Sequence, residues 1–543
     1  MSDNNINTPV LIVGGGPVGI GMSIELGYRG INSVLIEQGD GSIEHPRTGL
    51  VAVRTMEAFR RWGMVDDVRN CGFPETYNLS MVFCTSLKGL LLDREKYACM
   101  KDSPTPIETP EKKQRCPQMW LQPIMTKAAL NNSHGQILFN HRFDNFVQSE
   151  HGVKASVTDL LTGNTKSIHS QYLLACDGAS SVVRKSVGIN MQGRLLSYSI
   201  NILIRAKNLV NQHNMGEGER YMFVGPEGMW GNLTVVDGDE IWRLTVLGSE
   251  EKMNLETFDS HYWIERAFGT LDSTDKIPFE ILSVTPWRRS EMLAEKYIAG
   301  RVFLVGDSAH TMSPTGGMGM NTGIQEVIDL GWKLEGALKG WAGPKLLESY
   351  DLERRPIAKR NISFSTQNFK AWQDTPNPQT VCDNSAEGKL TRAIIGKRLR
   401  DSTRVEWESM GLQIGHRYDN SPICIPDGSP ATPDDFSVYI PTTRPGSRAP
   451  HAWLKDGKST LDLFGKNFIL LCFDSNLKKG ITEMHEAFLE KNMPFEIIQL
   501  QEPEIAQLYE YPFVLVRPDG HVAWRGNVIK NAVNIVDTVR GAT

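Results

Sequence analysis

Residues 10–38 read VLIVGGGPVGIGMSIELGYRGINSVLIEQ, and this stretch decides the fold. Its first four residues form an apolar run that predicts a buried strand. A helix is predicted next from apolar residues at helical spacing, which are Val18, Met22 and Leu26. The following apolar run, 34–36, predicts a second strand. A strand, a glycine turn, a helix and a strand within about thirty residues predict a βαβ unit.

The glycines of this stretch follow the pattern GxGxxG, which favours dinucleotide binding over an ordinary glycine-rich turn. Gly14 permits a tight turn, Gly16 lets the backbone approach a pyrophosphate, and Gly19 allows the helix to pack closely on the sheet. Glu37, at the end of the second strand, can accept hydrogen bonds from ribose hydroxyls. The helix N-terminus adds positive potential for the phosphates. The pattern alone does not separate FAD from NAD.

Two later segments have the same local design. The apolar runs 171–175 and 301–305 predict strands, and each runs into a turn that pairs an acidic residue with glycine, Asp177-Gly178 and Gly306-Asp307. The second turn leads into PTGGMGMN at 314–321. A helix after this turn is predicted by apolar residues at helical spacing, namely Ile324, Val327, Ile328, Leu334 and Leu338.

In this order, the three segments resemble the class A flavoprotein aromatic hydroxylases. In that family the Asp equivalent to Asp307 binds a ribityl hydroxyl of FAD, and the glycine-rich turn after it lies against the flavin ring. The segment 176–184 resembles a motif implicated in binding both FAD and NAD(P)H. His45-Pro46-Arg47 and Gln122 also match the family pattern, in which the Arg reaches the FAD pyrophosphate and the Gln lies near the flavin.

The resemblance therefore implies an FAD site with many main-chain contacts. It is predicted to contain Gly14, Gly15, Gly16, Pro17, Val18, Gly19, Glu37, Gln38, Arg47, Gln122, Asp177, Gly178, Asp307, Pro314, Gly317, Met318, Gly319, Met320 and Asn321. The helix that begins near 321 would point its positive end at the flavin and stabilise an anionic reduced flavin.

The resemblance also implies the reaction. NADH or NADPH reduces FAD, O₂ forms a flavin C4a-hydroperoxide, and a small phenolic or catecholic ring is hydroxylated. The expected context is the degradation of aromatic compounds. Whether a ring substituent is lost in the reaction is left open. The alternative within the family is a hydroxylase or epoxidase of a polycyclic, polyketide-like substrate. A flavin disulfide reductase is disfavoured because the eight cysteines include no CxxC pair. A non-catalytic FAD carrier is disfavoured because the glycine turns are intact.

A base is expected near the substrate, because a phenol has a pKa of about 10. His45 is the leading candidate, with ordering of the loop that carries Arg47 as the competing role. His310 is expected to pack or support rather than act as a base. Substrate contacts are predicted for four residues of the middle region, which are Tyr221, Trp230, Arg243 and Trp287.

Several positions depart from the family pattern. Thr126 stands where the family has Glu, and Glu326 and Asp329 stand where it has Asp and Asn. Ser308 replaces an alanine after Asp307, a small-for-small exchange that is expected to be neutral. These departures put local supporting contacts in doubt, while the cofactor assignment is unaffected.

The predicted fold class is a multidomain α/β protein. Residues 1–75, 101–190 and 296–375 are predicted to form a Rossmann-like FAD-binding domain of the glutathione-reductase and p-hydroxybenzoate-hydroxylase type. A substrate-binding antiparallel sheet is predicted for 76–100 and 191–295 from short β-rich stretches with polar turns. The Pro- and Asn-rich stretch 376–435 is predicted to be an irregular connection. Residues 436–543 resemble the thioredoxin-like C-terminal domain of the phenol hydroxylase branch, without a redox CxxC.

Composition limits the partners. The chain is 40% hydrophobic and 22% charged with a formal net charge of -5, so nothing favours nucleic acid as a partner. No stretch is long and apolar enough for a membrane span and the N-terminus lacks a signal-peptide pattern, which indicates a cytoplasmic protein. No metal-ligand spacing is present. The expected ligands are a small aromatic substrate, O₂, FAD and NAD(P)H, and a homodimer is compatible with the resemblance.

Overall fold

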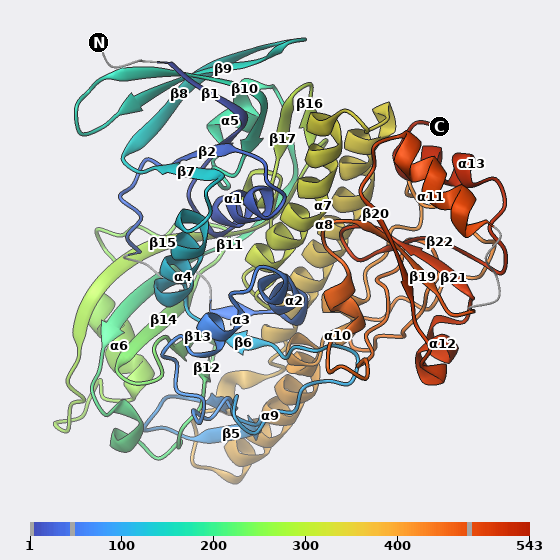
Figure 1. The fold of residues 1–543 in the computed structure, drawn as a ribbon. Helices are drawn as coiled ribbons and strands as arrows, with labels where there is room; N and C mark the ends of the chain where they lie inside the picture. Colours follow the sequence, from blue (N-terminus) through green and yellow to red (C-terminus); the bar gives the residue numbers. More distant parts are fainter. Residues whose placement is uncertain (1–4, 44–48, 475–479) are drawn as a thin grey trace.

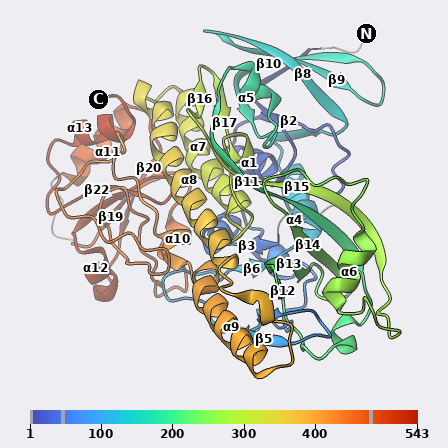
Figure 2. The same cartoon turned by 180° about the vertical axis from the view of Figure 1, so that it is seen from behind.

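The computed structural model describes residues 5–43, 49–474 and 480–543. It has the mixed α/β, multidomain architecture expected from the sequence (Figure 1). An eight-stranded sheet and its helices form the upper part of that view, a second eight-stranded sheet lies below it, and a four-stranded sheet with its helices lies to one side. Figure 2 shows the long helices α7 (Met318–Lys339) and α8 (Pro344–Trp372) running between the first sheet and the C-terminal part.

The first sheet has the strand order β16-β17-β10-β1-β2-β7, with parallel pairing from β17 to β7. Its central strand β1 is apolar and buried along Val10–Val13, as strands covered on both faces are. The hairpin β8–β9 extends β10 as an antiparallel edge. The strand bounds are β1 Asn5–Val13, β2 Ser33–Ile36, β7 Gly135–Leu138, β8 His141–Ser149, β9 Gly152–Asp159, β10 Thr165–Ala175, β16 Ile298–Ala299 and β17 Val302–Leu304.

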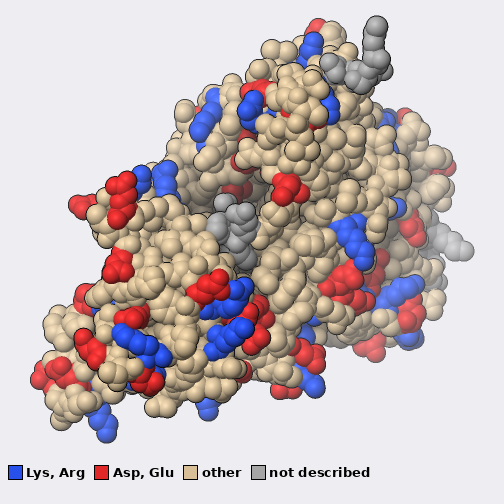
Figure 3. Space-filling model, turned by 90° about the vertical axis from the view of Figure 1, so that its left-hand side faces the viewer, with Lys and Arg blue, Asp and Glu red and all other residues tan. Residues whose placement is uncertain are grey.

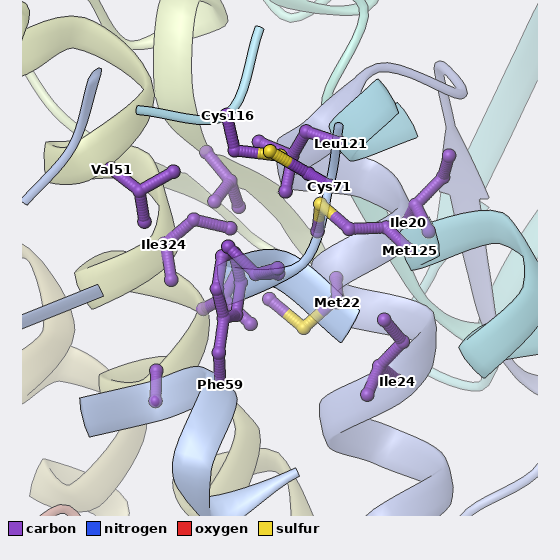
Figure 4. Close-up of a cluster of buried hydrophobic side chains, with 14 of the residues drawn as sticks. Ile20, Met22, Ile24, Val51, Phe59, Cys71, Cys116, Leu121, Met125 and Ile324 are labelled. Atoms are coloured by element: carbon purple, nitrogen blue, oxygen red, sulfur yellow. The ribbon is translucent and has the colours of Figure 1, made fainter. Parts of the chain in front are cut away.

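Helices from distant parts of the sequence cover this sheet. In Figure 4, Met22 and Ile24 of α1, Phe59 of α2, Met125 of α4 and Ile324 of α7 point toward one shared core. Packing on several sides explains why α1 is buried at every position from Gly19 to Leu26. The helix bounds here are α1 Pro17–Tyr28, α2 Val53–Arg61, α3 Val65–Arg69, α4 Gln118–Leu130 and α5 Val182–Ser186, and a short ladder joins β3 Leu50–Val51 to β6 Gln114–Arg115.

The second sheet has the order β18-β15-β11-β14-β13-β12-β4-β5. All its neighbouring strands are antiparallel except β12 and β4, which are parallel. Its strands come from two stretches of the sequence: β4 and β5 precede β7 to β10 of the first sheet, and the other six strands follow β10. The bounds are β4 Met81–Cys84, β5 Leu91–Glu95, β11 Met191–Arg205, β12 Arg220–Gly225, β13 Gly228–Val235, β14 Ile241–Leu247, β15 Glu280–Ala294 and β18 His310–Thr311, with α6 at Ser260–Phe268.

The prediction of an irregular connection over 376–435 is wrong for its first half. Residues Ala386–Trp407 form the helix α9, capped by the Ser385 side chain, and Met410–Ile414 form the short helix α10. Ile395 and Leu399 of α9 are fully buried against the outer strands of the second sheet. The Pro- and Asn-rich signals lie at the ends of the segment, and they concealed the helical spacing between them.

The C-terminal sheet has the order β20-β19-β21-β22, with one parallel and two antiparallel pairs. Alternate residues of β19 face opposite layers: Phe468 and Leu470 pack toward α11 and α13, whereas Ile469 and Leu471 pack toward α12. Trp332 of α7 joins the first of these layers and so docks the C-terminal part on the rest of the chain. The bounds are β19 Phe468–Cys472, α11 Ile481–Glu490, β20 Phe495–Gln499, α12 Pro503–Tyr509, β21 Phe513–Val516, β22 Val522–Gly526 and α13 Ala532–Val539.

On the face shown in Figure 3, acidic and basic side chains are interspersed among other residues. None of the helices in the described ranges combines the length and the apolar character that crossing a membrane requires.

Candidate functional site

The predicted cofactor turns meet at one edge of the first sheet because its strands end in register. Val13 of β1 pairs with Ile36 of β2 and with Ala175 of β10, and Ala175 pairs with Leu304 of β17. The turns that follow these strands therefore leave the sheet side by side. The carboxyl edge of a parallel sheet is where such folds bind nucleotides.

The first glycine turn, between β1 and α1, has the conformation that its glycines permit. Gly14 has φ +106°, and a Cβ there would overlap the carbonyl oxygen of Cys176. A Cβ on Gly19 would overlap the carbonyl oxygen of Gly14, so the helix approaches the turn at backbone distance. At Gly16, in contrast, a Cβ would meet nothing within 4 Å. The turn is therefore packed on its protein side and open at Gly16, where α1 begins with Pro17 and has no side-chain cap.

Two polar side chains already hold this turn. Glu37 accepts hydrogen bonds from the Gly15 backbone N–H at 2.6 Å and from the Gly39 N–H at 2.7 Å. Gln122 of α4 donates from Nε2 to the Gly15 carbonyl at 2.5 Å, while its buried Oε1 has no hydrogen-bond partner in the described part of the chain. Gln38 is exposed beside Glu37. Its predicted role and the ribose contact of Glu37 stay predictions.

The Gly306-Asp307 turn and α7 are joined to the first glycine turn through Val18. A Cβ on Gly306 would lie 3.1 Å from Val18, and a Cβ on Gly323 of α7 would lie 2.5 Å from it. Only glycine allows α7 to approach α1 this closely. The Val18 side chain thus lies against both the Gly306-Asp307 turn and α7. The segment at Asp177-Gly178 meets the first turn through Cys176, whose carbonyl lies against Gly14 and whose Cβ lies 3.2 Å from a Cβ on Gly19, so the three predicted segments lie together.

The N-terminus of α7, like that of α1, has no side-chain cap. Its N-cap, Gly317, has φ +65° and gives no side-chain cap. Asn321 fixes this end, because it donates to the carbonyls of Leu50 and Gly317 and accepts from the Ala52 backbone N–H at 2.9 Å. Pro314 and Asp307 are exposed at this edge, and Met318, Gly319 and Met320 form the first turn of the helix.

These residues fit FAD. The buried Asp177 Oδ1 has no hydrogen-bond partner among the described residues, although its Oδ2 accepts from the Val183 N–H, and Gly178 beside it has φ +77°. Orphaned acceptors, two uncapped helix N-termini and the space at Gly16 suit a ligand that has hydroxyl donors and phosphates. The residues that would hold it are those of the three turns, with Gln122 and Asn321.

The departures from the family pattern have a structural role here. Glu326 is fully buried; it accepts from the Gly306 N–H at 2.8 Å and pairs with His310 Nε2 at 3.1 Å. Burial alone would lower the pKa of His310, but the Glu326 carboxylate outweighs it and raises the pKa. His310 therefore supports the turn. The Ser308 hydroxyl donates to the Ala175 carbonyl at 2.6 Å and accepts from the Val305 N–H, a contact that an alanine would lack.

The predicted substrate residues lie in different settings. Tyr221 is fully buried, with its hydroxyl on the Gly216 carbonyl at 2.7 Å, and Trp230 stacks on Phe223 at 5.0 Å between ring centroids. Both occupy the core of the second sheet. Trp287 is half-buried on β15. Arg243 is desolvated, and burial together with the charges of Arg220 and Arg115 lowers its pKa to about 10.

His45, Pro46 and Arg47 lie outside the described residues. The catalytic assignment of His45 and the pyrophosphate assignment of Arg47 therefore stay predictions.

A small cavity of about 60 Å³ adjoins the cofactor turns. Leu50 lines it, and the Leu50 side chain also lies 3.2 Å from where a Cβ of Gly317 would be. Lys113, Arg115 and Glu219 line its polar wall, with Arg115 and Glu219 paired at 3.3 Å. Desolvation lowers the pKa of Lys113, whose Nζ donates to the Trp407 carbonyl.

Among the residues that line this cavity, Lys113 and Arg115 are basic and Glu219 is acidic. Arg220 pairs with Glu406 at 3.2 Å and lies over the rings of Trp372 and Trp407. Sequence reasoning missed Lys113, Arg115 and Arg220, because they come from separate segments; the only local signal was the basic run 112–115.

Known proteins resemble this chain along nearly its whole length. Residues 7–365 match the FAD binding domain family, and residues 442–540 match the C-terminal domain of aromatic-ring hydroxylases. A protein of Streptomyces halstedii provisionally named as a polyketide hydroxylase is 32% identical over 95% of this chain and 93% of its own. Phenol 2-monooxygenase of Pseudomonas sp. (strain EST1001) is 30% identical over 96% of this chain and 90% of its own.

Among solved structures, chromopyrrolic acid-soaked RebC with bound 7-carboxy-K252c superimposes with a TM-score of 0.91. That chain is 39% identical, and the match covers 99% of this chain and 100% of RebC.

Proposed function

The chain belongs to the FAD-dependent aromatic-ring hydroxylases, and on this premise we propose that it hydroxylates a phenolic or catecholic ring in its anionic form, with O₂ and NADH or NADPH as co-substrates. The observation that carries the proposal is the pair of basic side chains, against one acidic side chain, that lines the small cavity beside the cofactor turns. Lys113 and Arg115 line the cavity there, against Glu219 alone among its lining residues. FAD, when bound, supplies the oxygen-activating chemistry, and the nicotinamide supplies the electrons.

The protein's part in the reaction is to bind, orient and ionise the substrate. A nearby positive charge favours the ionised form of an acid, so Lys113 and Arg115 lower the pKa of a bound phenol from its usual value of about 10. An ionised phenol is richer in electrons and reacts more readily with electrophilic oxygen. At about 60 Å³ the cavity is smaller than the roughly 150 Å³ void that holds benzene, so it is proposed to receive the oxygen-bearing edge of the ring and not the whole ring. Leu50 and Leu79 give it an apolar side, which limits the access of water.

His45 remains the predicted base. His45→Ala is expected to depress hydroxylation at neutral pH and to recover in part at high pH, where the phenol ionises without help. Turnover that is unchanged across this range would remove His45 from the mechanism.

A second candidate substrate is a polycyclic, polyketide-like ring system, hydroxylated or epoxidised. The Streptomyces halstedii relative and the RebC complex favour it, since the chain aligns with both over at least 95% of its length. The two candidates share the cofactor site and differ in the size of the substrate chamber.

The test is a panel of phenols, catechols, their carboxylated forms and polyketide-like rings. Substrate-stimulated NAD(P)H oxidation, hydroxylated product and H₂O₂ are each quantified. The proposal is supported if an acidic aromatic compound yields hydroxylated product in an amount that matches the NAD(P)H oxidised. Release of H₂O₂ without product from every compound would contradict it.

Substitution of Arg115 tests the charge argument separately. Arg115→Met is expected to raise the KM of an acidic substrate at least tenfold while FAD content stays unchanged, and Arg115→Lys is expected to restore most of the loss. Equal KM values in all three proteins would show that the cavity charge does not bind the substrate.

A further inference from the structure

A larger cavity, of about 180 Å³, lies between the FAD-binding part and the C-terminal sheet. It is enclosed by α2, α7, α8 and the turn that joins β21 to β22. In Figure 1, α2 lies on the side of the FAD-binding part that faces the C-terminal sheet. None of the residues that line the cavity belongs to the turns at 14–19 or 314–321, so it is separate from the cofactor site.

The acidic side chains of this cavity all have basic partners. Glu57 pairs with Arg54 at 2.7 Å and with Arg448 at 2.5 Å. The other three, each bound to Arg or Lys, are Asp329, Asp462 and Asp519. Their charge is neutralised locally, so none of them is left to balance a further cation.

Two arginines of the cavity lack such partners. Arg354 of α8 is fully buried, and only its Nη1 has contacts, at 3.1 Å to the Tyr418 hydroxyl and 3.4 Å to His416 Nε2. Its Nε and Nη2 have no hydrogen-bond partner in the described ranges. Arg61 of α2 makes no ion pair with the described residues, and its buried Nη1 also has no partner. Burial would lower the pKa of Arg354, but the charges of Tyr418, Glu326 and Asp329 outweigh it and raise the pKa. Neither carboxylate accepts a hydrogen bond from the buried Nε or Nη2 of Arg354, and Arg61 Nη1 also lacks an acceptor among the described residues. Buried donors without acceptors are costly, so an anionic acceptor is expected beside these two arginines.

The β21–β22 turn brings further donors to the same place. A Cβ on Gly520 would lie 3.6 Å from Arg54 Nη2 and 4.0 Å from Arg61 Nη2, so both guanidiniums flank the tip of the turn. His521 and His416 stand next to each other, with ring centroids 5.3 Å apart, and His521 Nε2 and His416 Nδ1 have no hydrogen-bond partner among the described residues. Burial lowers the pKa of His521 to about 4, so the ring is neutral at pH 7 and can donate one N–H.

We propose that this cavity binds a small organic oxyanion, a carboxylate or a phosphate ester, through Arg354 and Arg61. Guanidinium groups bind carboxylate and phosphate oxygens through paired N–H donors. Ile328, Leu461 and Phe464 also line the cavity, and their apolar side chains suit a ligand with a short hydrocarbon body. The cavity exceeds the roughly 150 Å³ void that holds a benzene molecule in an engineered protein core, so it admits such a ligand.

The test is calorimetric titration of the FAD-loaded enzyme with butyrate, and separately with inorganic phosphate. Saturable binding of either anion is expected, weakened at least tenfold in Arg354→Gln. Because Arg354 is buried and its loss can impair folding, Arg61→Gln gives the second measurement, with the same direction of effect. Arg355→Gln is the matched control: Arg355 follows Arg354 on α8, pairs with Asp351 at 3.2 Å and has a side chain that is 39% exposed, so binding is expected to change less than twofold.

The two anions distinguish the sources of the ligand. Binding of butyrate alone identifies a carboxylate site, and binding of phosphate alone identifies a phosphate site. Absence of saturable binding of both anions, or binding that Arg61→Gln and Arg354→Gln leave unchanged, would overturn the proposal. Hydroxylation of the aromatic substrate is measured in parallel, and its loss or retention does not bear on this result.

Discussion

The cofactor turns and the seam between the FAD-binding part and the C-terminal sheet are built on opposite principles. The turns use backbone: Gly14 and Gly19 leave no room for side chains, and Gly16 faces open space. The seam uses buried charge. Arg517 of the C-terminal part pairs with Glu353 at 2.6 Å and with Asp329 at 3.3 Å, and all three side chains are almost completely buried.

The difference explains how each region fails when it is altered. A turn made of backbone fails by steric overlap and loses its ligand. A seam made of charge fails electrostatically, since removing one partner leaves the others buried without compensation. Substitutions in the turns should therefore change FAD content, and substitutions in the seam should change the free energy of unfolding.

The largest effect is expected from Gly14→Ala. The residue has φ +106°, and the added Cβ would overlap the Cys176 carbonyl, so the turn cannot keep its shape. FAD affinity should fall at least a hundredfold, measured by absorbance of the purified protein after FAD titration. Gly163→Ala is the control, because Gly163 also has a positive φ, +74°, but a Cβ there meets nothing within 4 Å. Equal FAD affinity in the two variants would contradict the steric account.

The seam is tested by Arg517→Met. Glu353 and Asp329 would keep their ion pairs with Lys333, whereas Asp519 would lose its guanidinium partner. The free energy of unfolding should therefore fall by about 3–5 kcal/mol. Urea unfolding followed by circular dichroism measures it. FAD affinity under native conditions should stay within a fewfold of the original. A variant with unchanged stability and lost FAD would reverse the assignment of the two regions.

The buried charges of the seam are also expected to make the free energy of unfolding depend on pH in the acid range. Burial would raise the pKa of Glu57, but Arg448 and Arg54 outweigh it and hold the pKa at about 2, below the ordinary value of 4.5. A carboxyl with a depressed pKa stabilises the folded state above about pH 4.5, and the benefit, about 3 kcal/mol, is lost as the pH falls toward 2. In Glu57→Gln this share of the pH dependence should vanish from urea unfolding curves between pH 4.5 and 2. An unaltered slope would show that Glu57 is not held ionised.

The smallest effect is expected at an exposed ion pair. Arg205 and Glu280 form a hydrogen bond of 2.5 Å, but their side chains are 38% and 61% exposed. Arg205→Met should change the free energy of unfolding by no more than about 1 kcal/mol. A loss as large as that of Arg517→Met would mean that burial is not what distinguishes the seam.

The same contrast separates the features that could be predicted from the sequence from those that could not. The strands around the turns, the helix α7 and the mixed α/β architecture were predictable, because glycine spacing and apolar runs are local signals. The partnership of Arg517 with Glu353, 164 positions away, has no local signal. Lys113 and Arg115 were missed for the same reason. The helix α9 was missed because Pro and Asn at both ends of its segment outweighed the spacing of Ile395 and Leu399.

Titration of the FAD-free protein with FAD, in the original chain and in Gly16→Ala, tests the central claim most directly. Gly16 has an ordinary extended conformation and a Cβ there meets nothing within 4 Å, so the variant should fold with an unchanged unfolding midpoint. The account predicts one FAD bound per chain, at least tenfold more weakly in Gly16→Ala. An original chain that binds no FAD, or a variant that binds it equally well, would contradict it.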